Sequence, residues 1–500
     1  MLEAFYKTHN YLVEHVHVPA RRVLMDEIAW SDRLIAIKGG RGVGKTDFLL
    51  NYAKELRRTN PELSQHTLYV NFNDFYFTEH SLVEFAGEFV AAGGRVLLID
   101  QAFKYPNWSE ELSQCFFRYP NLHIIFTASS VMRLVEDNKD IGTIVRPYNL
   151  RGFSFREYLN VTLGLKLPVF SLEEILHNHV DIARRICQSI HPFDYFNDYL
   201  HHGYYPLFLE PHDFSESLLK MMNMILEVDV LLIKQIEVSS LPKLRKLLHL
   251  MLQDTPCGLN VSNISDAIEC SRSTTMNYIK YLKDARLLNL LYPEGKQFPL
   301  KPTKVYMQNT NLCYATSIRE MDKQTVAETF FYNALHGNHK INATDRSAMF
   351  IIDGKYYMDA LATTPSKTGI RYCAIGDLEV GSQKNIPLWL HYIPDSIVIA
   401  PCGIIQATHS LHENVRLGRD FCQFLDNLGQ TPVIGLRGGS NIGGTTKYDR
   451  ICRTLVIKAQ AHQVCGAFAG GLRLGETVPS FLPGKDGGAG CATVNEFVTG

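Results

Sequence analysis

Short apolar runs alternate with amphipathic stretches over the first third of the chain. The run at 34–38, Leu-Ile-Ala-Ile-Lys, predicts a buried strand. In the stretch that follows, Phe48, Tyr52 and Leu56 recur at helical spacing and form one apolar stripe. Further apolar runs predict strands at 67–72, 96–99, 123–127 and, from a weaker pattern, 144–148. Strands separated by helical or loop stretches are typical of a parallel α/β sheet.

A glycine-rich loop joins the first strand to its helix and matches G-x-x-x-x-G-K-[ST] in full. Glycines let successive backbone N–H groups point into one cavity, and the helix N-terminus adds the positive end of its dipole. The pattern predicts a binding site for the phosphates of ATP. The residues expected to contact the nucleotide are Gly39, Gly40, Arg41, Gly42, Val43, Gly44, Lys45, Thr46 and Asp47.

Three polar groups complete the expected chemistry. Lys45 neutralises the β- and γ-phosphates, and the Thr46 hydroxyl ligates Mg²⁺. Asp100 ends the strand at 96–99, at the Walker B position, where its carboxylate holds the water shell of the metal. At the end of the fourth strand, Thr127 and Ser129 carry hydroxyls that either sense the γ-phosphate or cap the next helix, and the sequence favours neither role.

A local basic segment stands out from the rest of the chain. The net charge of −1 over 500 residues argues against a basic surface covering the whole protein, yet 241–304 holds ten Lys and Arg against five Asp and Glu. Helical patterns near 261–268 and after Ser271 suggest helix-turn-helix, with Asn277, Lys280 and Lys283 exposed on the second helix. Stretches 287–292 and 304–307 are expected to form the wing. Binding of double-stranded DNA and a pure packing role remain equal alternatives.

Targeting and metal-binding patterns are missing from the sequence. The first 22 residues carry charges and histidines where a signal peptide needs an apolar stretch, and nowhere do eighteen apolar residues run together. We therefore expect a cytoplasmic protein with no membrane segment. The 11 cysteines are scattered without zinc-binding spacing, so structural disulfides and a zinc site are not expected.

Longer stretches of the sequence resemble a known family. They read DRLIAIKGGRGVGKTDFLL, IDQAFKYPNWSEEL, IIFTASS, GFSFREYL, YFNDYLHHGYYPLFLE, KPTKVYMQNTNLCYA, ETFFYNALHGNHK and IPLWL. Over roughly 22–390 the chain is similar to bacterial and archaeal AAA-type ATPases that carry a winged helix and a C-terminal nuclease-like domain of unknown function. The resemblance implies an α/β, parallel-sheet P-loop core with a helical lid, a winged helix and an α+β nuclease-like domain.

The chain departs from this family at groups that matter for catalysis. Relatives place a glutamate after the Walker B aspartate to polarise the attacking water, and this chain has Gln101, which cannot take a proton. At 140–144, Asp-Ile-Gly-Thr-Ile replaces a stretch whose arginines look like fingers that complete a neighbouring site. Arg146 or Arg151 is a candidate substitute, although nothing in the spacing supports either. The expected catalytic residues are Lys45, Asp100 and Gln101. Because Gln101 replaces the glutamate and the arginines are missing, we expect little turnover of ATP.

The C-terminal third has lost the pattern of an active nuclease. The stretch 350–355 fits the family's catalytic strand best, with Ile351 in place of a metal-binding glutamate and Lys355 retained. Glu328, Asp353 and Asp359 are candidates to rebuild a site, but we expect them to be solvated surface charges. Beyond 394 the resemblance ends, and the last hundred residues hold 17 of the 35 glycines, so only 415–428 looks helical.

These patterns and the family resemblance together predict six segments: an N-terminal segment at 1–30, the P-loop domain at 31–160, a helical lid at 161–238, a winged helix at 239–310, a degenerate nuclease-like domain at 311–395 and an unassigned tail at 396–500. The expected function is ATP binding with weak or absent hydrolysis, in a nucleotide-dependent regulator or a DNA-associated module. An active ATPase motor on DNA is the alternative, and a non-functional descendant is a third. The oligomeric state is left open.

Overall fold

The computed structural model describes residues 2–17, 21–315, 320–344, 348–364, 371–392, 479–483 and 489–493. The chain divides into two compact units, Met1–Ile399 and Ala400–Gly500. In the second unit, β13 (Pro479–Pro483) and β14 (Ala489–Thr493) form an antiparallel pair. The helix expected at 415–428 lies outside the described residues.

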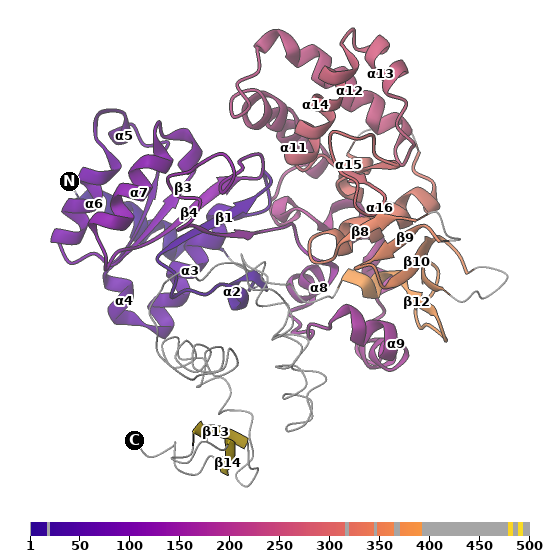
Figure 1. Ribbon diagram of the computed structural model, residues 1–500, viewed down its shortest axis with the longest axis horizontal. Coiled ribbons are helices and arrows are strands. Elements are labelled where there is room, and N and C mark those ends of the chain that lie inside the picture. Colours follow the sequence, from indigo (N-terminus) through magenta and orange to yellow (C-terminus); the bar gives the residue numbers. More distant parts are fainter. Residues whose placement is uncertain are drawn as a thin grey trace. The chain divides into compact units, whose positions relative to one another are not determined.

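The first unit begins with a five-stranded, fully parallel sheet in the order β2-β3-β4-β1-β5 (Figure 1). Its strands are β1 (Leu34–Gly39), β2 (Thr67–Asn71), β3 (Val96–Asp100), β4 (His123–Ser129) and β5 (Arg146–Asn149). The expected parallel α/β sheet is thus confirmed. The edge strand β5 begins two residues later than the apolar pattern suggests, because its apolar residues 144 and 145 lie in the turn before it.

Helices cover both faces of this sheet because successive strand residues point to opposite sides. Ile35 and Ile37 pack with Phe48 of α3 (Lys45–Thr59), whereas Leu34 and Ala36 pack with α6 (Leu82–Ala91) and α7 (Trp108–Arg118) (Figure 1). The N-terminal helix α1 (Leu2–His15) packs along the edge strand β2. The shorter elements of this domain are α2 (Leu24–Glu27), α4 (Pro61–Gln65), α5 (Tyr76–Glu79) and η1 (Ala102–Lys104).

A run of helices follows the sheet. It comprises α8 (Phe155–Leu163), α9 (Leu172–Cys187), α10 (Phe193–Asp198), η2 (Tyr199–Gly203), η3 (Pro206–Leu209), α11 (Phe214–Met224), η4 (Ile225–Val230) and η5 (Val238–Ser240). Two of these, η2 and η4, are π-helical turns that continue α10 and α11. Such turns often occur at functional positions because they shift the side chains of a helix by one residue.

The basic segment folds into α12 (Leu241–Asp254), α13 (Val261–Ala267) and α14 (Arg272–Asp284), followed by the antiparallel pair β6 (Leu288–Leu291) and β7 (Lys304–Met307). The expected helices and hairpin are therefore present. The expected exposure of Lys280 is wrong, because its side chain is 25% exposed and its ammonium lies 2.6 Å from an Asp284 carboxylate oxygen. The Lys283 side chain is 43% exposed and lies 3.6 Å from the other oxygen of Asp284. Asn277 is exposed as expected.

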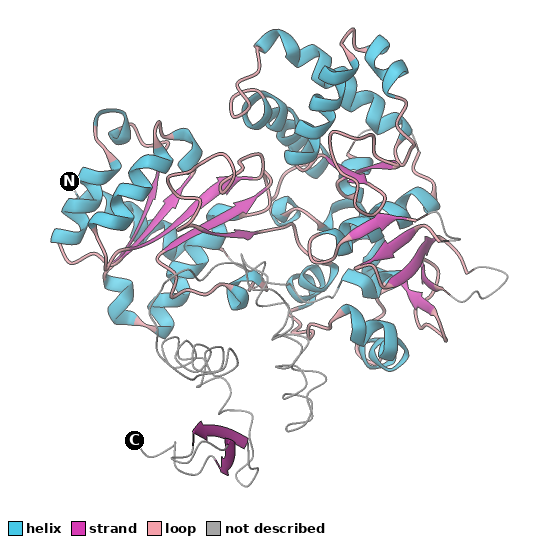
Figure 2. Ribbon diagram, viewed as in Figure 1, coloured by secondary structure: helices cyan, strands magenta, loops and turns pink. Residues whose placement is uncertain are grey.

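A second, mixed sheet in the order β12-β11-β10-β9-β8 follows (Figure 2). Its strands are antiparallel from β8 to β10 and parallel from β10 to β12. The elements of this region are α15 (Thr310–Tyr314), α16 (Lys323–His336), β8 (Ile341–Ala343), β9 (Phe350–Ile352), β10 (Tyr356–Leu361), β11 (Tyr372–Ile375), β12 (Asn385–Pro387) and η6 (Leu388–Tyr392). The expected strand at 350–355 ends at Ile352, since Asp353 and Gly354 form a turn with φ of 52° and 68°.

The three acidic residues considered as metal ligands in this region lie within salt-bridge distance of basic side chains. Glu328 and Asp359 are buried, at 5% and 3% exposure, so the expectation that they are solvated surface charges is wrong. Glu328 lies 2.6 Å from Lys304, and Asp359 pairs with Arg371. Asp353 is exposed. No cluster of three or more His, Cys, Asp or Glu able to hold a metal occurs among the described residues.

Two buried histidines predict that the fold loses stability in mild acid. Burial lowers the pKa of both His9 and His391 from 6.5 to about 4, with Arg57 and His179 adding smaller effects. Between these values the unfolded chain binds more protons than the folded one. The free energy of unfolding should therefore fall by roughly 1.4 kcal/mol per ring for each pH unit below about 6.5.

Chemical denaturation between about pH 7 and about pH 5 measures this slope. The variant His391→Phe should show a shallower pH dependence than the parent, and replacement of the exposed His15 by Gln should leave it unchanged. An equal slope in His391→Phe and the parent would contradict the assignment.

Candidate nucleotide-binding site

The glycine-rich loop lies where β1 meets α3. Gly42 and Gly44 have φ of 79° and 86°, a conformation that side chains other than glycine rarely adopt. Lys45 turns back over the loop, and its Nζ donates to the carbonyl oxygens of Gly39 at 3.0 Å and Gly40 at 2.7 Å. Burial lowers the pKa of the Lys45 ammonium to about 8, while the carboxylates of Asp229 and Asp100 act in the opposite direction. The loop thus holds a cation at its centre.

The side chain of Asp100 lies at the carboxyl end of β3 and is held from several sides. The Thr46 hydroxyl donates to Asp100 Oδ2 at 2.7 Å, and the Tyr69 hydroxyl donates to the same oxygen at 3.0 Å. The Thr127 hydroxyl donates to Oδ1 at 2.6 Å. The fold therefore brings together the two residues expected to hold magnesium, Thr46 and Asp100. One carboxylate and one hydroxyl suit Mg²⁺, which takes its other ligands from water and nucleotide phosphates.

Two residues around Asp100 have roles that the sequence pattern does not reveal. Tyr69 was not expected at the site, since its position in β2 predicts only a core residue, and its hydroxyl fixes the Asp100 carboxylate. Thr127, expected to face the γ-phosphate or to cap a helix, contacts Asp100 instead and also accepts from the backbone N–H of Gln101 at 2.8 Å. Gln101 has a φ of 58°, so its backbone turns sharply at the end of β3.

Ser129, the other expected sensor, contacts the helical segment after the sheet. Its hydroxyl donates to Asp229 Oδ1 at 3.0 Å, and Arg41 of the loop donates through Nε to Asp229 Oδ2 at 2.7 Å. Asp229 lies on η4 and is 6% exposed. Sequence reasoning missed this residue, although a carboxylate inside the apolar stretch 225–233 was a usable signal.

The same helical segment covers the loop. A Cβ at Gly42 would overlap the sulfur of Met221, and one at Gly44 would lie 3.4 Å from Pro206. The Tyr205 hydroxyl, next to Pro206, accepts from Asn309 Nδ2 at 3.0 Å. Residues near 205 and near 309 thus pack together, although they are more than a hundred positions apart.

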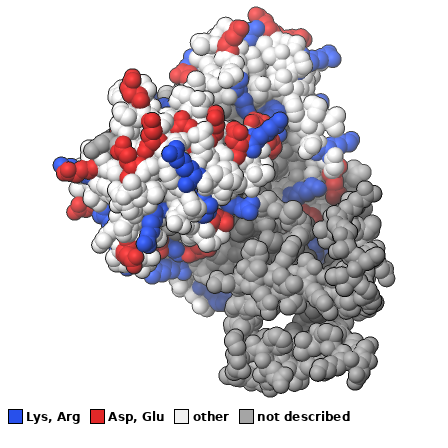
Figure 3. Space-filling view, turned by 60° about the vertical axis from the view of Figure 1, so that its left-hand side comes forward, with Lys and Arg blue, Asp and Glu red and all other residues white. Residues whose placement is uncertain are grey.

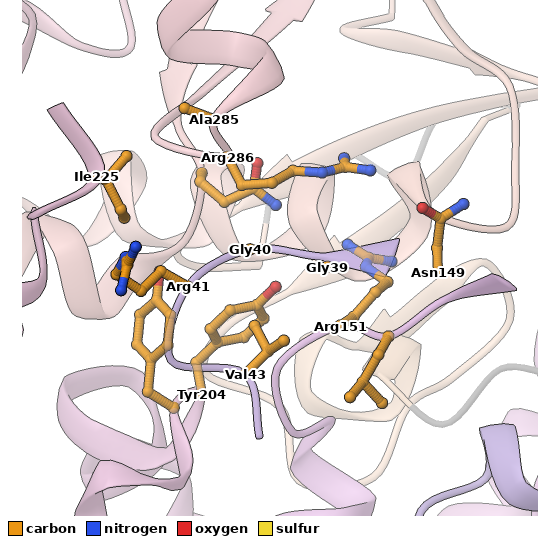
Figure 4. Close-up of a pocket in the computed structure, with 13 residues that line it drawn as sticks. Gly39, Gly40, Arg41, Val43, Asn149, Arg151, Tyr204, Ile225, Ala285 and Arg286 are labelled. Carbon is orange, nitrogen blue, oxygen red and sulfur yellow. The ribbon is translucent and has the colours of Figure 1, made fainter. Parts of the chain in front are cut away.

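A small cavity of about 20 Å³, room for about one water molecule, lies beside the loop (Figure 4). Arg151, which follows β5, and Arg286, which follows α14, both line it. A Cβ at Gly40 would lie 3.5 Å from Arg286 Cβ, so the turn after α14 contacts the loop. Arg151 Nη2 donates to Asn333 Oδ1 at 3.0 Å. Arg286 forms no ion pair with any described residue, and burial together with Arg151 lowers its pKa.

Comparison with known families gives two matches. Residues 31–159 match an AAA domain, and residues 193–322 match a domain of unknown function, DUF8612. The second match includes both the residues near 205 and those near 309 that pack together. The parallel sheet, the glycine-rich loop and the first match agree on an AAA-type P-loop domain.

Individual proteins are more distant. The uncharacterized protein MJ1637 of Methanocaldococcus jannaschii is 25% identical over 274 residues, which cover 52% of this chain and 57% of that protein. Among solved structures, Aeropyrum pernix ORC1 in complex with DNA is 12% identical with a TM-score of 0.27, covering 62% of this chain and 90% of that one. AMPPCP-bound DnaA from Aquifex aeolicus is 14% identical with a TM-score of 0.20, covering 56% of this chain and 87% of that one.

No described helix is both long and apolar enough to span a membrane.

Proposed function

We propose that this chain binds ATP as its magnesium complex in the loop at 39–46, hydrolyses it slowly or not at all, and acts as a nucleotide-dependent regulator or DNA-associated module. The contact that carries the proposal is the 2.7 Å hydrogen bond between Thr46 and Asp100, beside the Lys45 ammonium. It places a metal-binding pair next to a phosphate-binding cation, which is the combination that a magnesium nucleotide requires.

In this proposal the loop residues Gly39, Gly40, Arg41, Gly42, Val43, Gly44, Lys45, Thr46 and Asp47 surround the phosphates. Thr46 and Asp100 would hold Mg²⁺, whose charge would stabilise negative charge on the phosphates. Asp47 weakens affinity without abolishing it, because its carboxylate repels phosphate while the loop amides and Lys45 remain. Burial, Glu210 and Asp100 raise the pKa of Asp47.

The proposal of slow hydrolysis is supported by the groups around Thr46 and Asp100, the two proposed magnesium-binding residues. The side chain of Gln101 is a neutral amide at the position where a carboxylate would polarise the attacking water. Arg146 lies on the edge strand β5, 3.9 Å from Asp32, and Arg151 donates to Asn333. In this conformation each candidate finger contacts another group of the protein.

A regulatory role is supported by the contact between the loop and the segment after α14. Arg286 packs on Gly40 and directly follows α14, the helix that would read DNA in a winged helix. A phosphate that moves the loop therefore shifts groups attached to α14. The winged-helix assignment of 239–310 and its binding of double-stranded DNA are part of this proposal.

Calorimetric titration of Mg-ATP into the full chain tests the central claim. We expect one site per chain and turnover well below the roughly 1–10³ s⁻¹ of typical enzymes. Absence of binding by well-folded protein contradicts nucleotide binding. Turnover within that range, abolished by Lys45→Ala, contradicts slow hydrolysis.

The alternative, an active ATPase motor on DNA, is favoured by the intact set of Lys45, Thr46 and Asp100. It predicts that duplex DNA stimulates phosphate release. On the face shown in Figure 3, acidic and basic side chains are interspersed, so DNA binding depends on a local group of cations. Arg272, Lys296 and Lys301 are exposed in the basic segment and fit this role. Fluorescence polarisation with duplex DNA at low and high salt decides whether binding occurs.

A further inference from the structure

Two groups expected to contact the nucleotide, one on the loop and one at the end of β4, converge instead on one carboxylate of the protein. Arg41 and the Ser129 hydroxyl both donate to Asp229, at 2.7 and 3.0 Å. Burial lowers the pKa of the Lys45 ammonium, and the nearby carboxylates of Asp229 and Asp100 act to raise it. Ser129 stands beside Gly39 in the register of β4 and β1, so this carboxylate lies at the mouth of the loop.

We propose that Asp229 occupies the place of the γ-phosphate, so that this conformation accepts ADP and ATP must displace Asp229. The inference rests on the proposed nucleotide binding, and it adds that this conformation prefers the diphosphate to the triphosphate. A γ-phosphate needs the same donors, and two anions cannot share one guanidinium and one hydroxyl without repulsion. ADP has no terminal phosphate at this position, so the contacts of Asp229 persist when it binds.

Displacement of Asp229 moves a defined part of the fold. Asp229 lies on the π-helical turn η4, which continues α11, and Met221 of α11 covers Gly42. On the outer side of the same turn, Glu227 lies 2.5 Å from Arg245 of α12. Triphosphate therefore moves η4 away from the loop and pulls on α12, the first helix of the basic segment. Diphosphate leaves this connection in place.

The variant Asp229→Asn tests the inference because it removes the charge and keeps the shape of the side chain. Calorimetry with Mg-ADP and Mg-AMPPCP on the full chain gives the two affinities. The parent should prefer Mg-ADP, and Asp229→Asn should raise affinity for Mg-AMPPCP by about 10- to 100-fold, with the affinity for Mg-ADP changing much less. Glu216→Gln, which neutralises an exposed carboxylate of α11 that lies 2.6 Å from Lys220 and away from the proposed link to α12, should behave like the parent.

Equal changes for both nucleotides, or an unchanged affinity for Mg-AMPPCP, would overturn the inference and leave nucleotide binding intact. Failure of both the parent and the variant to bind either nucleotide overturns the proposed function and this inference with it. Hydrogen exchange of the parent provides a test without substitution. Mg-AMPPCP should increase exchange at 225–231 and Mg-ADP should not, and the same response to both nucleotides would contradict the displacement.

Discussion

Replacing Gln101 with Glu should raise the rate of ATP hydrolysis by about 100-fold. A glutamate at this position supplies a carboxylate that polarises the attacking water, and the backbone that carries it is already placed. The Gln101 N–H donates to Asp100 Oδ1 at 3.0 Å and to the Thr127 hydroxyl at 2.8 Å. The backbone that carries the new glutamate is therefore held next to Asp100, one of the two proposed magnesium-binding residues. Phosphate release in a single turnover measures the chemical step without product dissociation.

Gln101→Ala is the control for this gain, because it removes the amide without adding a base and should stay as slow as the parent. A second Lys45→Ala substitution in the Gln101→Glu variant should abolish the gain. If Gln101→Glu binds Mg-ATP and hydrolyses it no faster than the parent, the missing arginines limit the rate and the glutamine does not.

Replacing Lys45 with Ala should weaken nucleotide affinity by about 100-fold or more. The ammonium makes hydrogen bonds to the Gly39 and Gly40 carbonyls, and with nucleotide bound it would exchange these for charge-assisted bonds to phosphate. Calorimetry with Mg-ADP gives the affinity directly. The rise in Tm that Mg-ADP produces in the parent should disappear in the variant.

Arg58→Ala is the matched control, since Arg58 lies on the same helix but its side chain is 80% exposed. It should bind Mg-ADP as the parent does. If Lys45→Ala retains the parent's affinity, the phosphates lie elsewhere, and the loop is then a turn that only resembles a nucleotide site.

The first sheet was predictable because its signals are local. Buried parallel strands need uninterrupted apolar runs, and these gave four strands within two residues of their ends. The weaker edge strand β5 was placed too early, since Tyr148 is its one buried residue and its apolar pattern is therefore less constrained than that of the central strands. The loop was predictable because its glycines and Lys45 must be adjacent in the chain to act together.

The sequence failed where a partner decides the role of a side chain. Helical spacing placed Lys280 outside and puts Asp284 one turn away from it, but spacing does not show that this pair is largely buried by the surrounding elements. Glu328 and Asp359 were expected to be surface charges because nothing in the sequence shows which cations reach them. Their cations, Lys304 and Arg371, come from other elements.

By itself, the sequence determined the strands of the first sheet, the glycine-rich loop with its P-loop pattern and the Asp100-Gln101 pair, because each is written in consecutive residues. Only the tertiary structure decided which groups meet at that loop. Asp229 and Arg286 arrive from about 190 and 245 positions along the chain, and no spacing rule connects them to Arg41 or Gly40. The physical reason is that contacts between distant segments are fixed by how whole elements pack, whereas a local pattern fixes only the element in which it lies.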